Sequence, residues 1–292
     1  MKDNELKNVF VFVHIAKTAG STLLYVLDKN FKGEHLLLNK SKKHDFFSNE
    51  ETQAIATIHS DVRCISSHSI VLPFKQPTNV KIRYIPFTFF RDPVERIFSE
   101  FLYHKSRVIK GLVTKEAPMD SFIKWYEFQL AYGNKISNGR WTFGKNLQLY
   151  HIDKNMNLES AKKRLSEEFL FAGITERFDE SLIIFKEKMK EVGVDLDIHY
   201  IKQNVTKNIL DLNEEREYLV KEYAEMLREN NKDEYEIYNF INANLDAEIE
   251  KYQGNFQLDL ERYKKSNKDI FRLKELTYKV KKRFKLMVCE YF

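Results

Sequence analysis

The 292-residue sequence is poor in cysteine, glycine, proline and long apolar runs, and each shortage excludes a class of protein. Its two cysteines, Cys64 and Cys289, lie far apart and give neither a disulfide framework nor the spacing of a zinc site. Nine glycines and five prolines are too few for a fibrous or low-complexity chain. No run approaches the roughly 18 apolar residues of a membrane-spanning helix, and no signal-peptide core is present. We therefore expect a cytoplasmic globular protein.

Charge is nearly balanced overall but is concentrated near the carboxyl end. The formal net charge of +5 is modest for this length and does not indicate a nucleic-acid partner. Between residues 264 and 285, the many lysines and arginines are opposed only by Asp269 and Glu275. Apolar residues recur there at helical spacing, namely Leu273, Leu276, Val280, Phe284 and Met287. We expect one domain over 1–260 and a basic amphipathic helix over 261–292, which either packs on the domain or lies on an anionic membrane surface.

Short apolar strands alternate with helical patterns along most of the chain. Runs of β-branched and aromatic residues predict strands within 9–13, 63–70, 81–90 and 169–174. Helical patterns follow at 21–27, from 93, at 121–132 and 157–168, before Gly193, and at 213–229 and 233–252. The polar segment up to about residue 65 is expected to be helix and loop. This alternation predicts an α/β fold, a parallel sheet flanked by helices, with a P-loop-like nucleotide-binding core and a helical C-terminal part.

Local signals also predict where two of these helices start. Asp92 precedes Pro93 and is followed by Glu95, which is the pattern of a capped helix beginning at Pro93. Asp179 is a candidate cap for the helix that ends before Gly193. Glu100 and His104 on the first of these helices are expected at the surface.

The segment HIAKTAGST, residues 14–22, links the first strand to the first helix. A strand, a loop of small hydroxyl residues and a helix form an arrangement that binds anions through backbone N–H groups. Ligands of parallel sheets bind at the carboxyl ends of the strands, where the segment 66–68 and Arg91 also fall. A lysine and an arginine there suit a ligand with two anionic groups, such as a nucleotide bisphosphate. Lys17 precedes Gly20 instead of following a second glycine, so the loop is not a Walker A loop.

Two segments resemble those of a known enzyme family. FVHIAKTAGSTL resembles the H-I-P-K-T-A-G-T-T-L segment of the carbohydrate sulfotransferases related to heparan sulfate 2-O-sulfotransferase, and FFRDPVERIFSEF is similar to their R-D-P-V-E-R-x-x-S segment. GKNLQLY and FAGITERFDESLIIF are similar to later family segments, so the likeness runs from about residue 10 to 185. Ala16 departs from the family, which usually has proline there. The resemblance implies the sulfuryl donor 3′-phosphoadenosine 5′-phosphosulfate, and no metal.

The resemblance also implies a role for each matching residue. Arg91 and Ser99 would hold the 3′-phosphate, and Lys17 would neutralise the bridging oxygen as the S–O bond breaks. His68 would be the general base, because it follows a strand and imidazole titrates near neutral pH. The 5′-phosphosulfate would be held by Lys17, Thr18, Ala19, Gly20, Ser21 and Thr22.

Structural roles are open for several of these residues. Arg91 is also placed to pair with Glu95. For His68, a structural hydrogen-bonding role is the alternative to the role of general base. His14 is expected inside the first strand, as a core histidine with satisfied hydrogen bonds. Asn146 and Gln148 either orient a ligand or tie a loop.

The sequence thus favours a sulfotransferase that acts on a hydroxyl acceptor, most naturally a carbohydrate. A P-loop nucleotide kinase or related phosphotransferase is the alternative enzyme. A noncatalytic protein that binds acidic glycans or a membrane through its basic tail is the alternative from another class.

Overall fold

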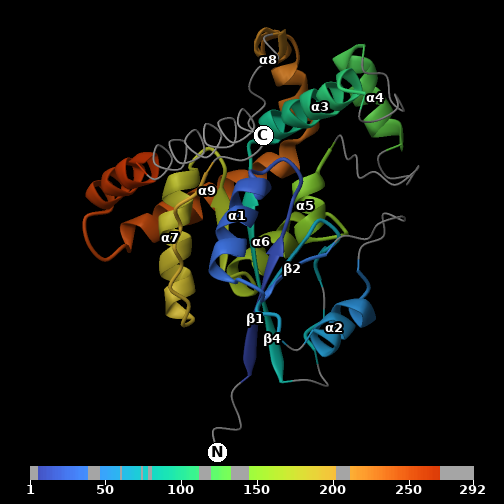
Figure 1. The fold of residues 1–292 in the computed structure, drawn as a ribbon. Helices are drawn as coiled ribbons and strands as arrows, with labels where there is room; N and C mark the ends of the chain where they lie inside the picture. The colour runs from blue at the N-terminus through green and yellow to red at the C-terminus, as the bar shows by residue number, and fades with distance from the viewer. Residues whose placement is uncertain are drawn as a thin grey trace, which may run out of the picture.

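The computed structural model describes residues 6–38, 47–59, 61–73, 75–77, 81–111, 120–132, 145–201 and 211–269. In this part of the chain, five parallel strands form one sheet that is flanked by helices (Figure 1). The predicted α/β fold is therefore confirmed. The order across the sheet is β2-β3-β1-β4-β5. The strands are β1 (Lys7–Val13), β2 (His35–Leu37), β3 (Cys64–Ser67), β4 (Ile82–Phe90) and β5 (Phe171–Ile174).

Helices connect the strands and make up most of the described residues after 145. Residues 256–269 are also helical, and the apolar residues of the predicted amphipathic tail lie outside the described residues. No helix in the described ranges is long and apolar enough to cross a membrane. The helices are α1 (Gly20–Asn30), α2 (Asn49–Ile58), α3 (Pro93–Ile109), α4 (Phe122–Tyr132), α5 (Leu147–Ile152), α6 (Leu158–Glu167), α7 (Phe178–Glu191), α8 (Asp211–Asn230) and α9 (Lys232–Glu250).

The central strand β1 fixes where a ligand can bind. Its apolar residues are buried because β3 and β4 flank it and helices cover it, and Phe12 and Val13 are fully buried. Val13 is in register with Ser67 of β3 and with Thr88 of β4. The Thr88 hydroxyl donates to the Val13 carbonyl at 2.8 Å. The chain leaves β1 toward β2 and leaves β4 toward β5, so the topological switch point lies between the carboxyl ends of β1 and β4.

The element β2 was not predicted from the sequence. The segment up to residue 65 was expected to be helix and loop, but it also contains this edge strand. The strand has only three residues, and Leu37 is 53% exposed, so it shows neither a buried run nor a clear alternation. Pairing with β3 forms the strand, and that contact is not visible in the local sequence.

One predicted helix start is confirmed and the other is wrong. The Asp92 side chain accepts a hydrogen bond from the Glu95 amide at 3.0 Å, and α3 begins at Pro93. In α7, by contrast, Arg177 is the residue before the helix, and Asp179 lies in its first turn, where it accepts a hydrogen bond from the Tyr200 hydroxyl at 2.9 Å.

A buried ionic cluster joins α3 to α9. Arg96 donates to Glu100 at 2.6 Å, and its Nε lies 3.9 Å from Glu234, all three side chains being at most 5% exposed. The expected surface position of Glu100 is therefore wrong, because it pairs with Arg96 in the interior, and His104 is half-buried beside it. Burial raises the pKa of Glu234, and the Arg96 charge opposes this rise.

We expect Arg96→Met to lower the free energy of unfolding by about 3–5 kcal/mol, because it leaves two buried carboxyl groups without their cation. Arg63→Met is the matched control, since Arg63 pairs with Glu34 where both side chains are 41% exposed, and it should cost less than about 1 kcal/mol. Urea unfolding of both variants measures the difference. Equal stability of the two variants would contradict a structural role for the buried cluster.

Candidate functional site

Most of the predicted site residues line one cavity of about 300 Å³ at the carboxyl ends of β1, β3 and β4. The exception is Thr18, which is buried and donates its hydroxyl hydrogen to the Ile15 carbonyl at 3.0 Å. Segments that are distant in the sequence therefore meet where the sheet topology places a ligand site. The lining consists of His14, Ala16, Lys17, Ala19, Gly20, Ser21, Thr22, His68, Arg91, Ser99 and Tyr103.

The loop between β1 and α1 has a specialised backbone. Lys17 and Ala19 have φ values of 70° and 62°, in the left-handed region that residues other than glycine seldom adopt. Left-handed residues in such loops turn successive N–H groups toward one concave side, which is a common anion-binding arrangement. The loop leads into the first turn of α1, where helix geometry leaves N–H groups pointing outward. The backbone therefore has the conformation of a common type of anion-binding loop.

The Lys17 side chain is half-buried beside the Tyr103 ring. Its Nζ lies 4.1 Å from the centre of the Tyr103 ring, a cation–π contact. The pKa of Lys17 is lowered to about 8, chiefly by burial; the Glu100 carboxylate opposes this change, and the Arg91 and Arg96 charges add to it. A cation in such surroundings gains strongly from a bound anion, because little water is available to solvate it.

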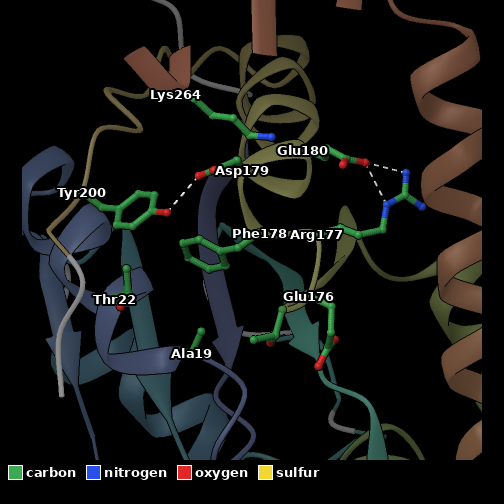
Figure 2. Close-up of a pocket in the computed structure, with 10 residues that line it drawn as sticks. Ala19, Thr22, Glu176, Arg177, Phe178, Asp179, Glu180, Tyr200 and Lys264 are labelled. Atoms are coloured by element: carbon green, nitrogen blue, oxygen red, sulfur yellow. Dashed lines mark hydrogen bonds and ion pairs between the residues drawn. The ribbon is translucent and has the colours of Figure 1, made fainter. Parts of the chain in front are cut away.

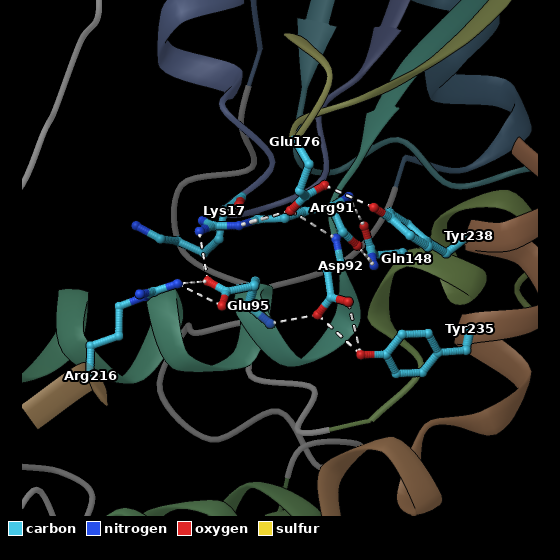
Figure 3. A network of polar contacts seen from close by, with 9 residues as sticks. All are labelled: Lys17, Arg91, Asp92, Glu95, Gln148, Glu176, Arg216, Tyr235 and Tyr238. Atoms are coloured by element: carbon cyan, nitrogen blue, oxygen red, sulfur yellow. Dashed lines mark hydrogen bonds and ion pairs between the residues drawn. The ribbon is translucent and has the colours of Figure 1, made fainter. Parts of the chain in front are cut away.

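Arg91 lies beside this loop and between two carboxylates, as Figure 3 shows. Its guanidinium is 3.5 Å from Glu95 and 3.7 Å from Glu176, and it donates to the Lys17 carbonyl at 3.3 Å. The expected pairing with Glu95 is confirmed, but both carboxylate distances exceed those of tight charge-assisted hydrogen bonds. Glu95 is bound more closely by Arg216, at 2.6 Å. Arg91 is therefore oriented by its neighbours and only loosely neutralised.

Gln148 ties down the backbone of Arg91. Its side-chain oxygen accepts from the Arg91 amide and its side-chain nitrogen donates to the Arg91 carbonyl, both at 2.8 Å. Of the two roles considered for this residue, the structure shows the structural tie. Asn146 precedes α5 with a φ of 56° and does not line the cavity; its backbone N–H donates to the side-chain oxygen of Asn231 at 3.3 Å.

The contacts of His68 define which ring nitrogen carries the proton. Its Nδ1 lies 2.5 Å from the carbonyl oxygen of His14, so Nδ1 is the donor. In the neutral ring, Nε2 is then the unprotonated nitrogen. Burial lowers the pKa of His68 below its ordinary value of 6.5, although the hydrogen bond to His14 opposes this effect. His68 therefore has the protonation state of a base at neutral pH.

The structure corrects the expectation for His14. It lies just after β1 instead of inside it, and its ring stacks on the His68 ring with centroids 3.7 Å apart. Its Nδ1 is buried and has no hydrogen-bond partner among the described residues, so this is not a satisfied core histidine. Burial lowers its pKa well below 6.5, and the charges of His68 and His151 act in the same direction.

Ala16 and Tyr103 also line the cavity, and neither was among the predicted site residues. Tyr103 stands four residues after Ser99 on α3, and that spacing places two side chains on the same helix face. The helical spacing could therefore have identified it.

A second cavity of about 360 Å³ adjoins the first (Figure 2). Ala19 and Thr22 line both cavities, so the two meet at the start of α1. Phe178 and Tyr200 form an aromatic wall in the second cavity, with their rings edge to face at 5.1 Å. Together the cavities have a part lined by two cationic side chains and a part with an aromatic wall.

Comparison with known proteins gives little further information. No protein-family model matches the chain. It is 28% identical over 202 residues to an uncharacterized protein of Archaeoglobus fulgidus, and the match covers 66% of this chain and 77% of that protein. The functional argument therefore depends on the site itself.

Proposed function

We propose that the protein is a sulfotransferase that moves a sulfuryl group from 3′-phosphoadenosine 5′-phosphosulfate to a hydroxyl acceptor, most naturally on a carbohydrate. The observation that carries this proposal is the single cavity that gathers the Lys17 loop, His68, Arg91 and Ser99. These are the residues to which the resemblance to carbohydrate sulfotransferases assigns the donor and the base. A generic strand-to-helix turn would not bring them together.

The two anionic ends of the donor match the two cations of the cavity. The loop from Lys17 to Thr22 would bind the 5′-phosphosulfate, with Lys17 next to the bridging oxygen. Arg91 and Ser99 would bind the 3′-phosphate, which distinguishes this donor from ATP. The aromatic wall of the adjoining cavity, formed by Phe178 and Tyr200, is suited to the nucleoside.

The proposed transfer needs positioning, charge neutralisation and one base. The bond between sulfur and the bridging phosphate oxygen breaks while a bond from sulfur to the acceptor oxygen forms. The acceptor hydroxyl proton passes to Nε2 of His68, the nitrogen that its contact with His14 leaves unprotonated. The electron pair of the broken bond stays on the phosphate oxygen, where Lys17 stabilises the charge.

Binding of the donor product tests the nucleotide assignment. At a concentration of about 100 times its Kd, 3′,5′-bisphosphoadenosine should raise Tm by about 5 °C through mass action. ATP at the same concentration should have a much smaller effect, and Arg91→Met should reduce the response to the bisphosphate. A larger shift with ATP would instead favour the nucleotide kinase.

Replacement of Lys17 tests the catalytic assignment. We expect Lys17→Ala to lower kcat by about a hundredfold or more, because it removes the cation at the leaving oxygen. The matched control is Lys32→Ala, which alters an exposed lysine outside the cavity. Sulfate transfer to a panel of glycans measures turnover, and circular dichroism shows whether the fold persists. A folded Lys17→Ala variant with normal turnover would refute the assignment.

The pH dependence of kcat/KM should be bell-shaped. His68 acts unprotonated, so activity falls as pH drops through its lowered pKa, below 6.5. Lys17 acts as a cation, so activity also falls as pH rises through about 8. In Lys17→Arg the alkaline fall should disappear, because arginine stays charged. A wild-type profile that stays flat to pH 10 would contradict the role given to Lys17.

A further inference from the structure

His14 is a buried polar side chain of the cavity that the proposed transfer step leaves unused. The residue is 6% exposed and lines the cavity, and its Nδ1 has no hydrogen-bond partner in the described part of the chain. Its ring stacks on His68 and also on Phe12, with a centroid distance of 4.9 Å to the latter. Because Nδ1 is enclosed by the protein, a ligand in the cavity can meet only the other ring nitrogen, Nε2.

The burial of Nδ1 determines the tautomer of His14. The ring is neutral at neutral pH, because burial and the neighbouring histidines disfavour its charged form. A neutral imidazole has one N–H group and one lone pair. An N–H group at Nδ1 would be a buried donor without an acceptor, whereas a lone pair without a partner is tolerated more often. The hydrogen is therefore on Nε2.

Nε2 of His14 lies at the first turn of α1. A Cβ atom placed on Gly20 would be 1.8 Å from Nε2, so the ring occupies the space that any other residue at position 20 would need. The glycine at the start of α1 is thus required by the His14 ring, which comes close to its backbone. This is also the place where the loop and the helix offer backbone N–H groups to an anion.

We propose that His14 donates a hydrogen bond from Nε2 to an oxygen of the phosphoryl or sulfuryl group that binds at the start of α1. A neutral imidazole can polarise such a group without adding a further positive charge beside Lys17. The stacked rings then have complementary roles, because His14 presents an N–H group and His68 presents a lone pair. The inference rests on the proposed function only for the identity of the group, because any phosphoryl or sulfuryl anion can test the contact.

The test uses the full chain with ¹⁵N-labelled histidine and inorganic pyrophosphate as the probe. Nuclear magnetic resonance should show the Nε2–H tautomer of His14 before addition, and the Nε2–H signal should shift and exchange more slowly with bound pyrophosphate. His14→Phe keeps a stacked ring but lacks the donor, so it should bind pyrophosphate about tenfold or more weakly. His14→Gln restores a donor and should recover part of the affinity. His59→Phe, an exposed ring that does not line the cavity, should bind like the wild type.

A His14 signal that does not change at saturating pyrophosphate would overturn the inference, and so would wild-type affinity in His14→Phe. If His14→Phe does not fold, the wild-type spectra decide. A second titration with 3′,5′-bisphosphoadenosine separates this inference from the proposed function. A His14 response to pyrophosphate without any binding of the bisphosphate would reject the proposed donor and keep the contact. Binding of both ligands without a His14 response would reject the contact alone.

Discussion

Burial of two neighbouring cations, Lys17 and Arg91, is the constraint on which the rest of the site depends. The Arg91 guanidinium donates to the Lys17 carbonyl, and burial lowers the pKa of both side chains. Glu95 and Glu176 lie near Arg91 at ion-pair distances longer than those of tight hydrogen bonds, and Glu100 is the carboxylate that acts on Lys17. Such an arrangement favours a ligand that supplies negative charge at two points.

The scaffold holds these cations through contacts behind the site. The Gln148 side chain fixes the Arg91 backbone with two hydrogen bonds. The backbone N–H of Gln148 donates to Glu234, which belongs to the buried cluster with Arg96. The fold and the site are thereby connected, because the cluster that joins α3 to α9 also supports the residue after β4. The histidines on the other side of the cavity remain uncharged for the same physical reason: burial lowers their pKa values.

Patterns within short segments predicted most of the fold. The buried run at β1, the Asp92 cap of α3 and the glycine after α7 each depend on neighbouring residues, and each is found in the structure. The strand β2 was missed because pairing with β3 forms it. The position of Asp179 near a helix start indicates a cap, but the chain enters that helix two residues earlier, at Arg177.

The residues of the site were predicted less evenly. The motif and strand-end positions identified Lys17, His68, Arg91 and Ser99, which the fold brings into one cavity. Contacts between distant segments determine the remainder. Glu100 is buried because it pairs with Arg96 on the same helix and because helices later in the chain pack against that helix. The position of His14 depends on its stacking with His68. Local sequence does not contain these contacts.

A crystal structure with 3′,5′-bisphosphoadenosine bound would test the central claim most directly, because that claim assigns each phosphate to its own residues. The account predicts the 5′-phosphate in the loop from Lys17 to Thr22 and the 3′-phosphate on Arg91 and Ser99. It places the adenine ring in the adjoining cavity lined by Phe178 and Tyr200. A bisphosphate bound elsewhere, or one with its 3′-phosphate away from Arg91, would contradict it.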